Sequence, residues 1–177
     1  FKSFIVIPMI ATSLSLSAFT AGVDQFVAAK ADDQALSVEA KALQMEREEK
    51  AAKIDAYYKK HDLPLAGYGM TMVLAGEKYD VDPYLLASIN MKESTGCKYH
   101  IKGTYNCSGW AGGKTKFKSY EEGIYNLAMN LGGDNPRTAH YYEGKSLEGI
   151  LKSYNSVIPT YGKEIVSIMK KIDAMSV

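Results

Sequence analysis

The spacing of apolar residues constrains the fold of this chain more than any other feature. From residue 32 onward, apolar residues recur three and four positions apart, which is the spacing of one face of an α-helix. No segment shows the sustained apolar–polar alternation that is typical of a half-buried β-strand. The sequence therefore predicts an all-α protein.

Start and stop signals give bounds to the predicted helices. Asp82-Pro83 predicts a helix start, because Asp caps helices and Pro is favoured at their first position. Residues 119–122 (Ser-Tyr-Glu-Glu) form a capping box, and Gly96 and Gly132-Gly133 can end helices. Glycines and polar residues make 97–118 an expected ordered loop. We expect helices over residues 32–61, 70–79, 82–93, 119–131, 138–143, 146–154 and 159–174.

The first part of the chain, residues 1–31, has the pattern of a signal peptide or membrane anchor. Lys2 precedes an uncharged run over residues 3–23, most apolar at residues 4–10, and residues 29–31 (Ala-Lys-Ala) offer a small-x-small cleavage site. The run is weak as a membrane-spanning helix, but an uncleaved anchor stays an alternative. Both interpretations predict an exported protein of the periplasm or cell envelope.

Two further parts are expected after this leader. Residues 32–62 form a charged amphipathic helix, which is interpreted as a stalk, a docking element or a helix packed on the domain. If residues 32–61 dock, the expected partner is an envelope-spanning protein complex. Residues 63–177 are expected to form a globular domain, to which the candidate catalytic residue below belongs. The apolar face of the long helix consists of Leu36, Ala40, Leu43, Ala51, Ile54 and Tyr58.

The charge balance argues against nucleic-acid binding, and the spacing of the cysteines and histidines argues against a metal site. With 21 basic and 20 acidic residues, the chain lacks the basic excess of a nucleic-acid-binding protein. Cys97 and Cys107 are its two cysteines, and in an oxidising compartment we expect them to form a disulfide; two free buried thiols are the alternative. The three histidines are scattered without zinc spacing, so neither a metal nor a cofactor is expected.

Glu93 is the candidate catalytic residue. It shares one helical face with Leu86 and Ile89, where carboxylates are rare unless they are paired or used. A buried carboxyl keeps its proton to higher pH, and a protonated carboxyl can act as a general acid. The alternatives are a glutamate paired with a nearby cation or turned to solvent. Residues 106–110 (Asn-Cys-Ser-Gly-Trp) follow and are interpreted as a sugar-binding turn.

These motifs together resemble the lysozyme-like superfamily. Residues 85–89 (Leu-Leu-Ala-Ser-Ile) and 92–96 (Lys-Glu-Ser-Thr-Gly) are similar to the catalytic helix of bacterial lytic transglycosylases and endo-β-N-acetylglucosaminidase-like domains. Residues 106–110 and 117–124 resemble the turn and the following stretch of the glucosaminidase-like branch. Tyr154-Asn155 resembles the Tyr-Asn pair near the transglycosylase active site.

The resemblance implies an all-α lysozyme-like fold with a peptidoglycan groove and Glu93 as the acid. The expected activity is cleavage of the glycan strand between N-acetylmuramic acid (MurNAc) and N-acetylglucosamine (GlcNAc). Asn106 is expected either to bind an N-acetyl group or to hold the turn, and Trp110 either to stack on a sugar ring or to pack in the core. Ser94 is expected either to contact substrate or to cap the helix end, and Tyr154 either to orient Glu93 or the substrate or to pack on its helix face. Gly109 would let the backbone approach a sugar closely. The candidate substrate-binding residues are Ser94, Asn106, Gly109, Trp110, Tyr154 and Asn155.

The choice between chemistries depends on a second carboxylate. Hydrolysis by water commonly uses two carboxylates, and Glu121 and Glu122 are candidates for the second, although capping explains both. In transglycosylases of the superfamily a single Glu acts as acid and then base. The absence of their Gly-Leu-Met-Gln run leaves the sub-branch open. A lytic transglycosylase is favoured; the alternatives are a glucosaminidase or muramidase hydrolase, and a non-catalytic scaffold or glycan-binding module of a cell-envelope machine.

Overall fold

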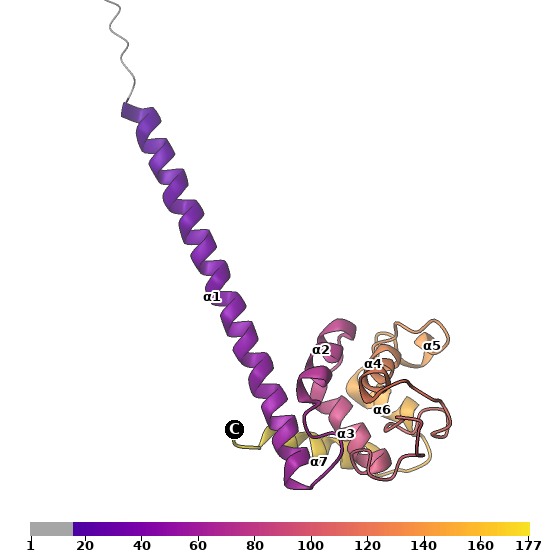
Figure 1. Cartoon of the computed structure of the whole chain (residues 1–177). Coiled ribbons are helices and arrows are strands. Elements are labelled where there is room, and N and C mark those ends of the chain that lie inside the picture. Colours follow the sequence, from indigo (N-terminus) through magenta and orange to yellow (C-terminus); the bar gives the residue numbers. More distant parts are fainter. Residues whose placement is uncertain (1–15) are drawn as a thin grey trace, which may run out of the picture. The chain divides into compact units, whose positions relative to one another are not determined.

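Helices are the only regular secondary structure in the part of the chain that the structure describes. The computed structural model describes residues 16–177, with side chains from residue 36, and this range contains seven helices and no strand (Figure 1). The predicted all-α class is confirmed, and every predicted helix is present. The loop 97–118 contains neither helix nor strand. The helices are α1 (Leu16–Lys60), α2 (Gly69–Tyr79), α3 (Pro83–Ser94), α4 (Tyr120–Leu131), α5 (Ala139–Tyr142), α6 (Leu147–Tyr154) and α7 (Tyr161–Asp173).

Helix α1 begins earlier than expected. It starts at Leu16 and continues without a break through residues 31 and 32, where the sequence predicted a boundary. Within residues 16–177, no helix combines the length and the apolarity that crossing a membrane requires. The most apolar part of the expected leader, residues 4–10, lies outside the described residues.

The chain divides into two compact units between Leu43 and Gln44. In the first unit, the predicted apolar face is not buried, because Leu36 is 63% and Leu43 is 45% exposed. In the second unit, the last turns of α1 supply core residues. The second compact unit therefore begins within α1, before the expected boundary between residues 62 and 63. The α1 residues of the core are Ala51, Ile54, Tyr57 and Tyr58.

The end of α1 also fixes the start of α2. Asp55 accepts hydrogen bonds from the backbone N–H groups of Gly67 and Gly69, each at 2.8 Å. Helix α2 has no side-chain cap of its own, so Asp55 provides an acceptor for backbone N–H groups that would otherwise lack one. A Cβ atom at Gly69 would lie 2.2 Å from the carbonyl oxygen of Ala51, so only glycine permits this approach.

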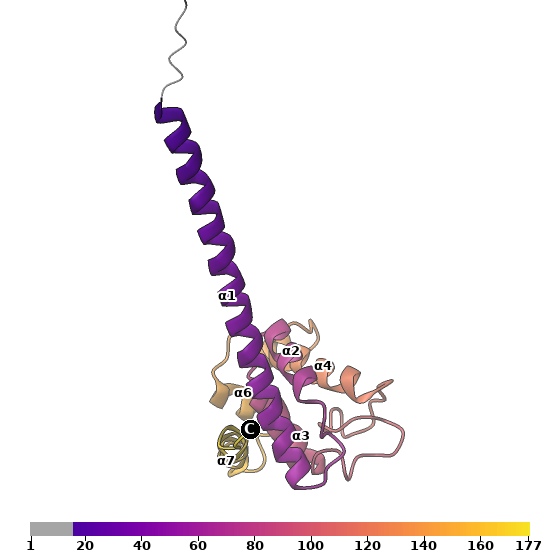
Figure 2. The same ribbon diagram turned by 60° about the vertical axis from the view of Figure 1, so that its left-hand side comes forward.

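Helix α3 is the central helix of the second unit. It contacts α2, α4 and α7 and lies among them in both views of the molecule (Figures 1 and 2). Its residues Leu86 and Ile89 are fully buried. The hydroxyl of Tyr58 donates to the carbonyl oxygen of Ala87 at 2.8 Å, which joins α1 to the middle of α3.

Both ends of α3 follow from local sequence. Asp82 caps the start by accepting from the N–H of Tyr84 at 2.7 Å, with Pro83 at the first position as predicted. At the other end Thr95, not Gly96, takes the first left-handed conformation, with φ of 53°. Gly96 follows at φ of 58°, where a Cβ would lie 2.9 Å from the Tyr58 ring. The end of α3 is therefore packed tightly against α1.

Candidate active site

Glu93 lies in the last turn of α3, and it is exposed. It shares a helix face with Leu86 and Ile89, as predicted, yet those two residues are fully buried and Glu93 is not. The prediction of a buried carboxylate is wrong, because the core ends one turn before Glu93 and a cavity opens beside it. Glu93 is therefore accessible to a ligand from that cavity.

The cavity beside Glu93 has a volume of about 290 Å³. It is formed by the end of α3, the loop 97–118, α5 and α6. Within the described part of the chain, Glu93 is the only carboxylate of its lining. The lining residues are Glu93, Ser108, Gly109, Trp110, Ala111, Gly112, Tyr142, Tyr154 and Asn155.

Tyr161 holds the carboxylate of Glu93. It lies in the first turn of α7, is 1% exposed, and its hydroxyl donates to Glu93 Oε1 at 2.7 Å. Burial, and then the hydrogen bond to Glu93, raise the pKa of Tyr161 well above its ordinary value. The hydroxyl therefore stays protonated and remains a donor. Among the described residues, no hydrogen bond is made to Glu93 Oε2.

Sequence reasoning missed Tyr161 and gave its role to Tyr154. The usable signal was its position, because Tyr161 lies four residues before the buried Ile165 and begins the apolar face of α7. A tyrosine on such a face needs a partner for its hydroxyl. In this protein the partner is a carboxylate 68 positions earlier in the chain.

Tyr154 supports the turn and lines the cavity. Its hydroxyl donates to the carbonyl oxygen of Ser108 at 2.5 Å, so it does not orient Glu93 directly. Burial, followed by the negative charge of Glu93, raises the pKa of Tyr154 well above its ordinary value. Its ring stacks on that of Tyr161, with 6.0 Å between the ring centroids. The two tyrosines therefore connect the turn to the carboxylate.

Gly109 brings the turn close to Glu93. Its φ is 67°, and a Cβ atom there would lie 3.2 Å from Glu93 Oε2. A side chain would thus be strained and would crowd the carboxylate oxygen that faces the turn. The backbone of the turn thus approaches the carboxylate closely at Gly109.

Aromatic rings form one wall of the cavity. Trp110 is half-buried, and its ring centroid lies 6.1 Å from that of Tyr154 and 6.3 Å from that of Tyr142. Sugar stacking and core packing are the two alternatives for Trp110. Its position is compatible with both, since Trp110 packs on the core and also lines the cavity. Sequence analysis did not identify Tyr142.

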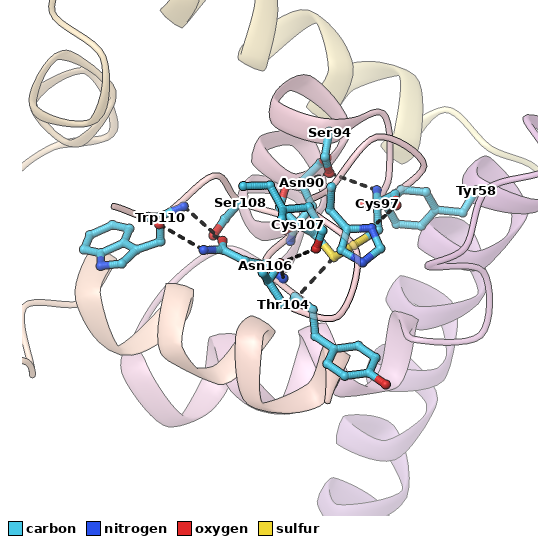
Figure 3. The surroundings of a disulfide bond; sticks show 12 residues. Tyr58, Asn90, Ser94, Cys97, Thr104, Asn106, Cys107, Ser108 and Trp110 are labelled. Carbon is cyan, nitrogen blue, oxygen red and sulfur yellow. Dashed lines mark hydrogen bonds between the residues drawn. A yellow bond between two sulfur atoms is a disulfide. The ribbon is translucent and has the colours of Figure 1, made fainter. Parts of the chain in front are cut away.

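Asn106 holds the turn and does not line the cavity. It is 2% exposed, and its Nδ2 donates to the carbonyl oxygens of Trp110 and Thr115 at 2.9 and 3.1 Å. Its Oδ1 accepts from the N–H of Trp110 at 3.0 Å, as Figure 3 shows. Both ends of the amide have partners within the turn, so of the two alternatives for Asn106 the structure favours holding the turn over contact with substrate.

Ser94 has a similar structural role. It is buried, its hydroxyl donates to the carbonyl oxygen of Cys107 at 2.7 Å, and it accepts from the N–H of Cys97 at 2.9 Å (Figure 3). Of the two alternatives considered for Ser94, the structure favours capping of the α3 end over substrate contact. Ser94 thus fixes the helix end that carries Glu93.

The predicted disulfide between Cys97 and Cys107 is confirmed. It joins the end of α3 to the turn, with 4.7 Å between the two Cα atoms (Figure 3). Both cysteines are buried among core residues. A bridge that closes a loop of this size contributes about 2–4 kcal/mol to stability. It also restricts movement between Glu93 and the turn that faces it.

Glu121 and Glu122 lie outside the cavity lining. Ser119 caps α4 by accepting from the N–H of Glu122 at 3.3 Å, and Glu122 accepts from the N–H of Lys118 at 2.5 Å. A hydrogen bond from the Ser119 side chain lowers the pKa of Glu121. The predicted Ser119 cap is confirmed, but Glu122 bonds to the N–H of Lys118 and not, as in a capping box, to that of Ser119. Neither glutamate supplies a second carboxylate to the cavity.

Asn155 lies at the edge of the cavity. Its Oδ1 accepts from the N–H groups of Val157 and Ile158 at 3.1 and 3.0 Å, which shapes the loop between α6 and α7. Residues 16–177 contain no group of three or more His, Cys, Asp or Glu residues that could hold a metal ion. The arrangement provides one accessible carboxylate that a buried tyrosine orients, which suits it to proton transfer.

No protein-family model matches this chain, and no curated protein or solved structure matches it significantly.

Proposed function

We propose that this protein is an exported enzyme of the periplasm or cell envelope that cleaves peptidoglycan glycan strands between MurNAc and GlcNAc. We assign it the lysozyme-like fold and the chemistry of a lytic transglycosylase. The observation that carries the proposal is the setting of Glu93. It is the only carboxylate of an aromatic-walled cavity within the described residues, and Tyr161 holds one of its oxygens.

A single carboxyl can perform both proton transfers of this reaction. As the acid, Glu93 gives its proton to the glycosidic oxygen while the C1–O bond breaks and the MurNAc ring gains oxocarbenium character. As the base, it then takes the proton of the 6-hydroxyl of the same sugar, whose oxygen bonds to C1. The products are a 1,6-anhydro-MurNAc end and a free GlcNAc 4-hydroxyl.

The cavity lining favours this chemistry over hydrolysis. Glycosidases that activate water or form a covalent intermediate commonly place two carboxyl groups about 5–10 Å apart. Here the carboxylates of Glu121 and Glu122 belong to the α4 cap and not to the lining. A single carboxyl suits a reaction in which the nucleophile is part of the substrate.

The walls of the cavity suit a sugar. Trp110, Tyr142 and Tyr154 supply flat apolar faces, and tyrosine and tryptophan also carry polar tips. Gly109 leaves room beside Glu93 Oε2, where a glycosidic oxygen would have to lie. At about 290 Å³ the cavity is at the small end of ligand sites, so a strand must extend beyond it.

The substitution Glu93→Gln tests the proposal. It keeps the size of an exposed side chain, so the melting temperature should stay unchanged, while the release of soluble fragments from purified peptidoglycan should fall about 100- to 10,000-fold. The matched control is Glu122→Gln, which alters a carboxylate outside the cavity and should retain the wild-type rate. Undiminished release by the Glu93→Gln protein would sink the assignment.

Product mass distinguishes the two chemistries. A transglycosylase leaves the mass of the substrate unchanged, whereas a hydrolase adds one water for each bond it cuts. We expect fragments that end in anhydro-MurNAc. Fragments with reducing ends would assign Glu93 to a glucosaminidase or muramidase instead.

The exposed apolar residues of α1 favour a second candidate function. Leu36, Val38 and Met45 are all more than half exposed, at 63%, 62% and 61%. They would let the helix dock a non-catalytic, glycan-binding domain onto an envelope-spanning complex. Wild-type protein that binds peptidoglycan but releases no fragments over long incubation would favour this function. Loss of localisation in a chain that keeps residues 1–31 but lacks residues 32–43 would support the docking role.

A further inference from the structure

A second and larger cavity adjoins the one that contains Glu93. It has a volume of about 710 Å³ and lies between α6, α7 and the loop that joins them. Asn155 lines both cavities. Any ligand of the larger cavity is therefore next to the ligand of the smaller one. The lining residues are Leu147, Glu148, Leu151, Lys152, Asn155, Ser156, Ile158, Pro159, Gly162, Lys163 and Val166.

The chemistry of the walls changes from one cavity to the other. The smaller cavity has three aromatic residues, whereas the lining of the larger cavity has none within the described residues. Its apolar surface is aliphatic, from residues such as Leu151, Ile158 and Val166. Sugar rings gain most from flat aromatic faces, so this cavity is poorly suited to a continuation of the glycan strand.

Two lysines give the larger cavity a positive edge. Lys152 and Lys163 are exposed, and neither has an ion pair in the part of the chain that the structure describes. Glu164, the nearest acidic side chain along α7, is already bonded to Lys92 and Thr160. The two ammonium groups are thus available to carboxylates of a ligand, and Glu148 is available to an amine.

We propose that the larger cavity binds the peptide branch of peptidoglycan, so that the enzyme prefers strands whose peptides are still attached. This inference rests on the proposed function. The branch combines methyl side chains, carboxylates and an amine, which match the aliphatic wall, the two lysines and Glu148. It leaves the strand at the lactyl group of MurNAc, the sugar whose bond Glu93 would break. Because Asn155 lines both cavities, a peptide branch that leaves MurNAc in the smaller cavity has only a short distance to reach the larger one.

The test compares two substrates from the same cell wall: peptide-bearing strands, and naked strands prepared with an amidase. We expect wild-type protein to cut the peptide-bearing strands about five times faster, the factor that two exposed ion pairs supply. In a protein with both Lys152→Glu and Lys163→Glu, the ratio of the two rates should fall to about one. The matched control carries Lys170→Glu and Lys171→Glu, which reverse two exposed lysines of α7 outside the cavity, and should keep the wild-type ratio.

Separate outcomes sink the inference and the proposed function. A wild-type ratio near one, or a ratio that the Lys152→Glu, Lys163→Glu protein retains, overturns the inference while cleavage itself stands. If neither substrate is cleaved, the proposed function fails, and titration with soluble N-acetylmuramyl tripeptide decides whether the cavity binds peptide. Binding that the double substitution weakens about fivefold supports the cavity's assignment; no binding overturns it. A wild-type dimer that this variant cannot form would assign the cavity to a second copy of the chain, which also overturns it.

Discussion

Glutamates lie at two helix ends of this protein, and their surroundings are opposite. Helix α4 begins with Glu121 and Glu122, where the positive end of the helix dipole and the cap favour a carboxylate. Helix α3 ends with Glu93, where the dipole disfavours it. Glu122 accepts a backbone N–H of its own helix start, whereas Glu93 accepts a hydroxyl from the distant α7.

The comparison separates carboxylates that helix capping explains from a carboxylate that is a candidate for chemistry. At the start of α4 the glutamates satisfy groups that the backbone leaves open, so structure alone explains them. At the end of α3 nothing local stabilises Glu93, and a buried tyrosine, a disulfide and a glycine turn are arranged around it. A carboxylate in an unfavourable place that is held from outside its helix is a candidate for chemistry.

Removing the disulfide should have the largest effect, and it should affect the end of α3 more than the start of α4. Replacing Cys97 and Cys107 by serine should lower the free energy of unfolding by about 2–4 kcal/mol and reduce cleavage, because the turn is freed from the α3 end. Denaturant unfolding and fragment release measure the two effects. Hydrogen exchange at the start of α4 should change less than at the end of α3. Equal changes at both ends would show that the bridge stabilises the whole domain and does not specifically fix the site.

Tyr161→Phe should have the next largest effect, on catalysis. Hydrogen bonds to charged groups contribute about 1.5–3 kcal/mol, so we expect kcat to fall about 10- to 100-fold with KM unchanged. The matched control is Tyr58→Phe, which also removes a buried hydroxyl that bonds to α3 but lies away from Glu93. The control should lose stability and keep kcat. Equal kcat values for the two variants would exclude a positioning role for Tyr161.

Ser119→Ala should affect stability alone. Loss of an N-cap side chain costs about 1 kcal/mol of unfolding free energy, and the α4 start does not line the cavity. Thermal unfolding and fragment release measure the two quantities. Ser167→Ala, an exposed serine inside α7, is the control and should change neither. A loss of activity in Ser119→Ala at full stability would mean that the α4 end takes part in the reaction.

The smallest expected effect is on the acid dependence of stability. The Ser119 hydroxyl holds the pKa of Glu121 below its ordinary value, so the stabilisation is present above that value and is lost as the pH falls through the folded-state pKa. Unfolding experiments between about pH 5 and pH 3 should therefore show a steeper loss of stability in wild-type protein than in Ser119→Ala. Parallel curves for the two proteins would contradict this assignment.

Helix positions were predictable because their signals are local. Asp82-Pro83 and Ser119 determine caps within a few residues, and the structure places both where the sequence predicts them. The disulfide was predictable for a similar reason, since the chain has two cysteines and a short loop between them. Asn106 was identified as important, but its partners are backbone groups that no pattern specifies.

The exposure of Glu93 and the part played by α1 could not be predicted in the same way. Spacing tells which helix face a residue occupies, but not where along that face the core ends. Leu36 and Ile54 belong to one apolar pattern, yet Leu36 is 63% exposed and Ile54 is fully buried. The bond between Tyr161 and Glu93 joins distant segments, so it depends on how α3 and α7 pack.

The packing of the α1 end has a practical consequence for anyone who wishes to cut or fuse this chain. Tyr58 bonds to α3, Asp55 caps the start of α2, and Ala51 lies against Gly69. A cut at residue 62, which the sequence pattern suggests, would remove all three supports. The smallest transplantable unit therefore begins near Gln44 and keeps the last turns of α1 as its own first helix.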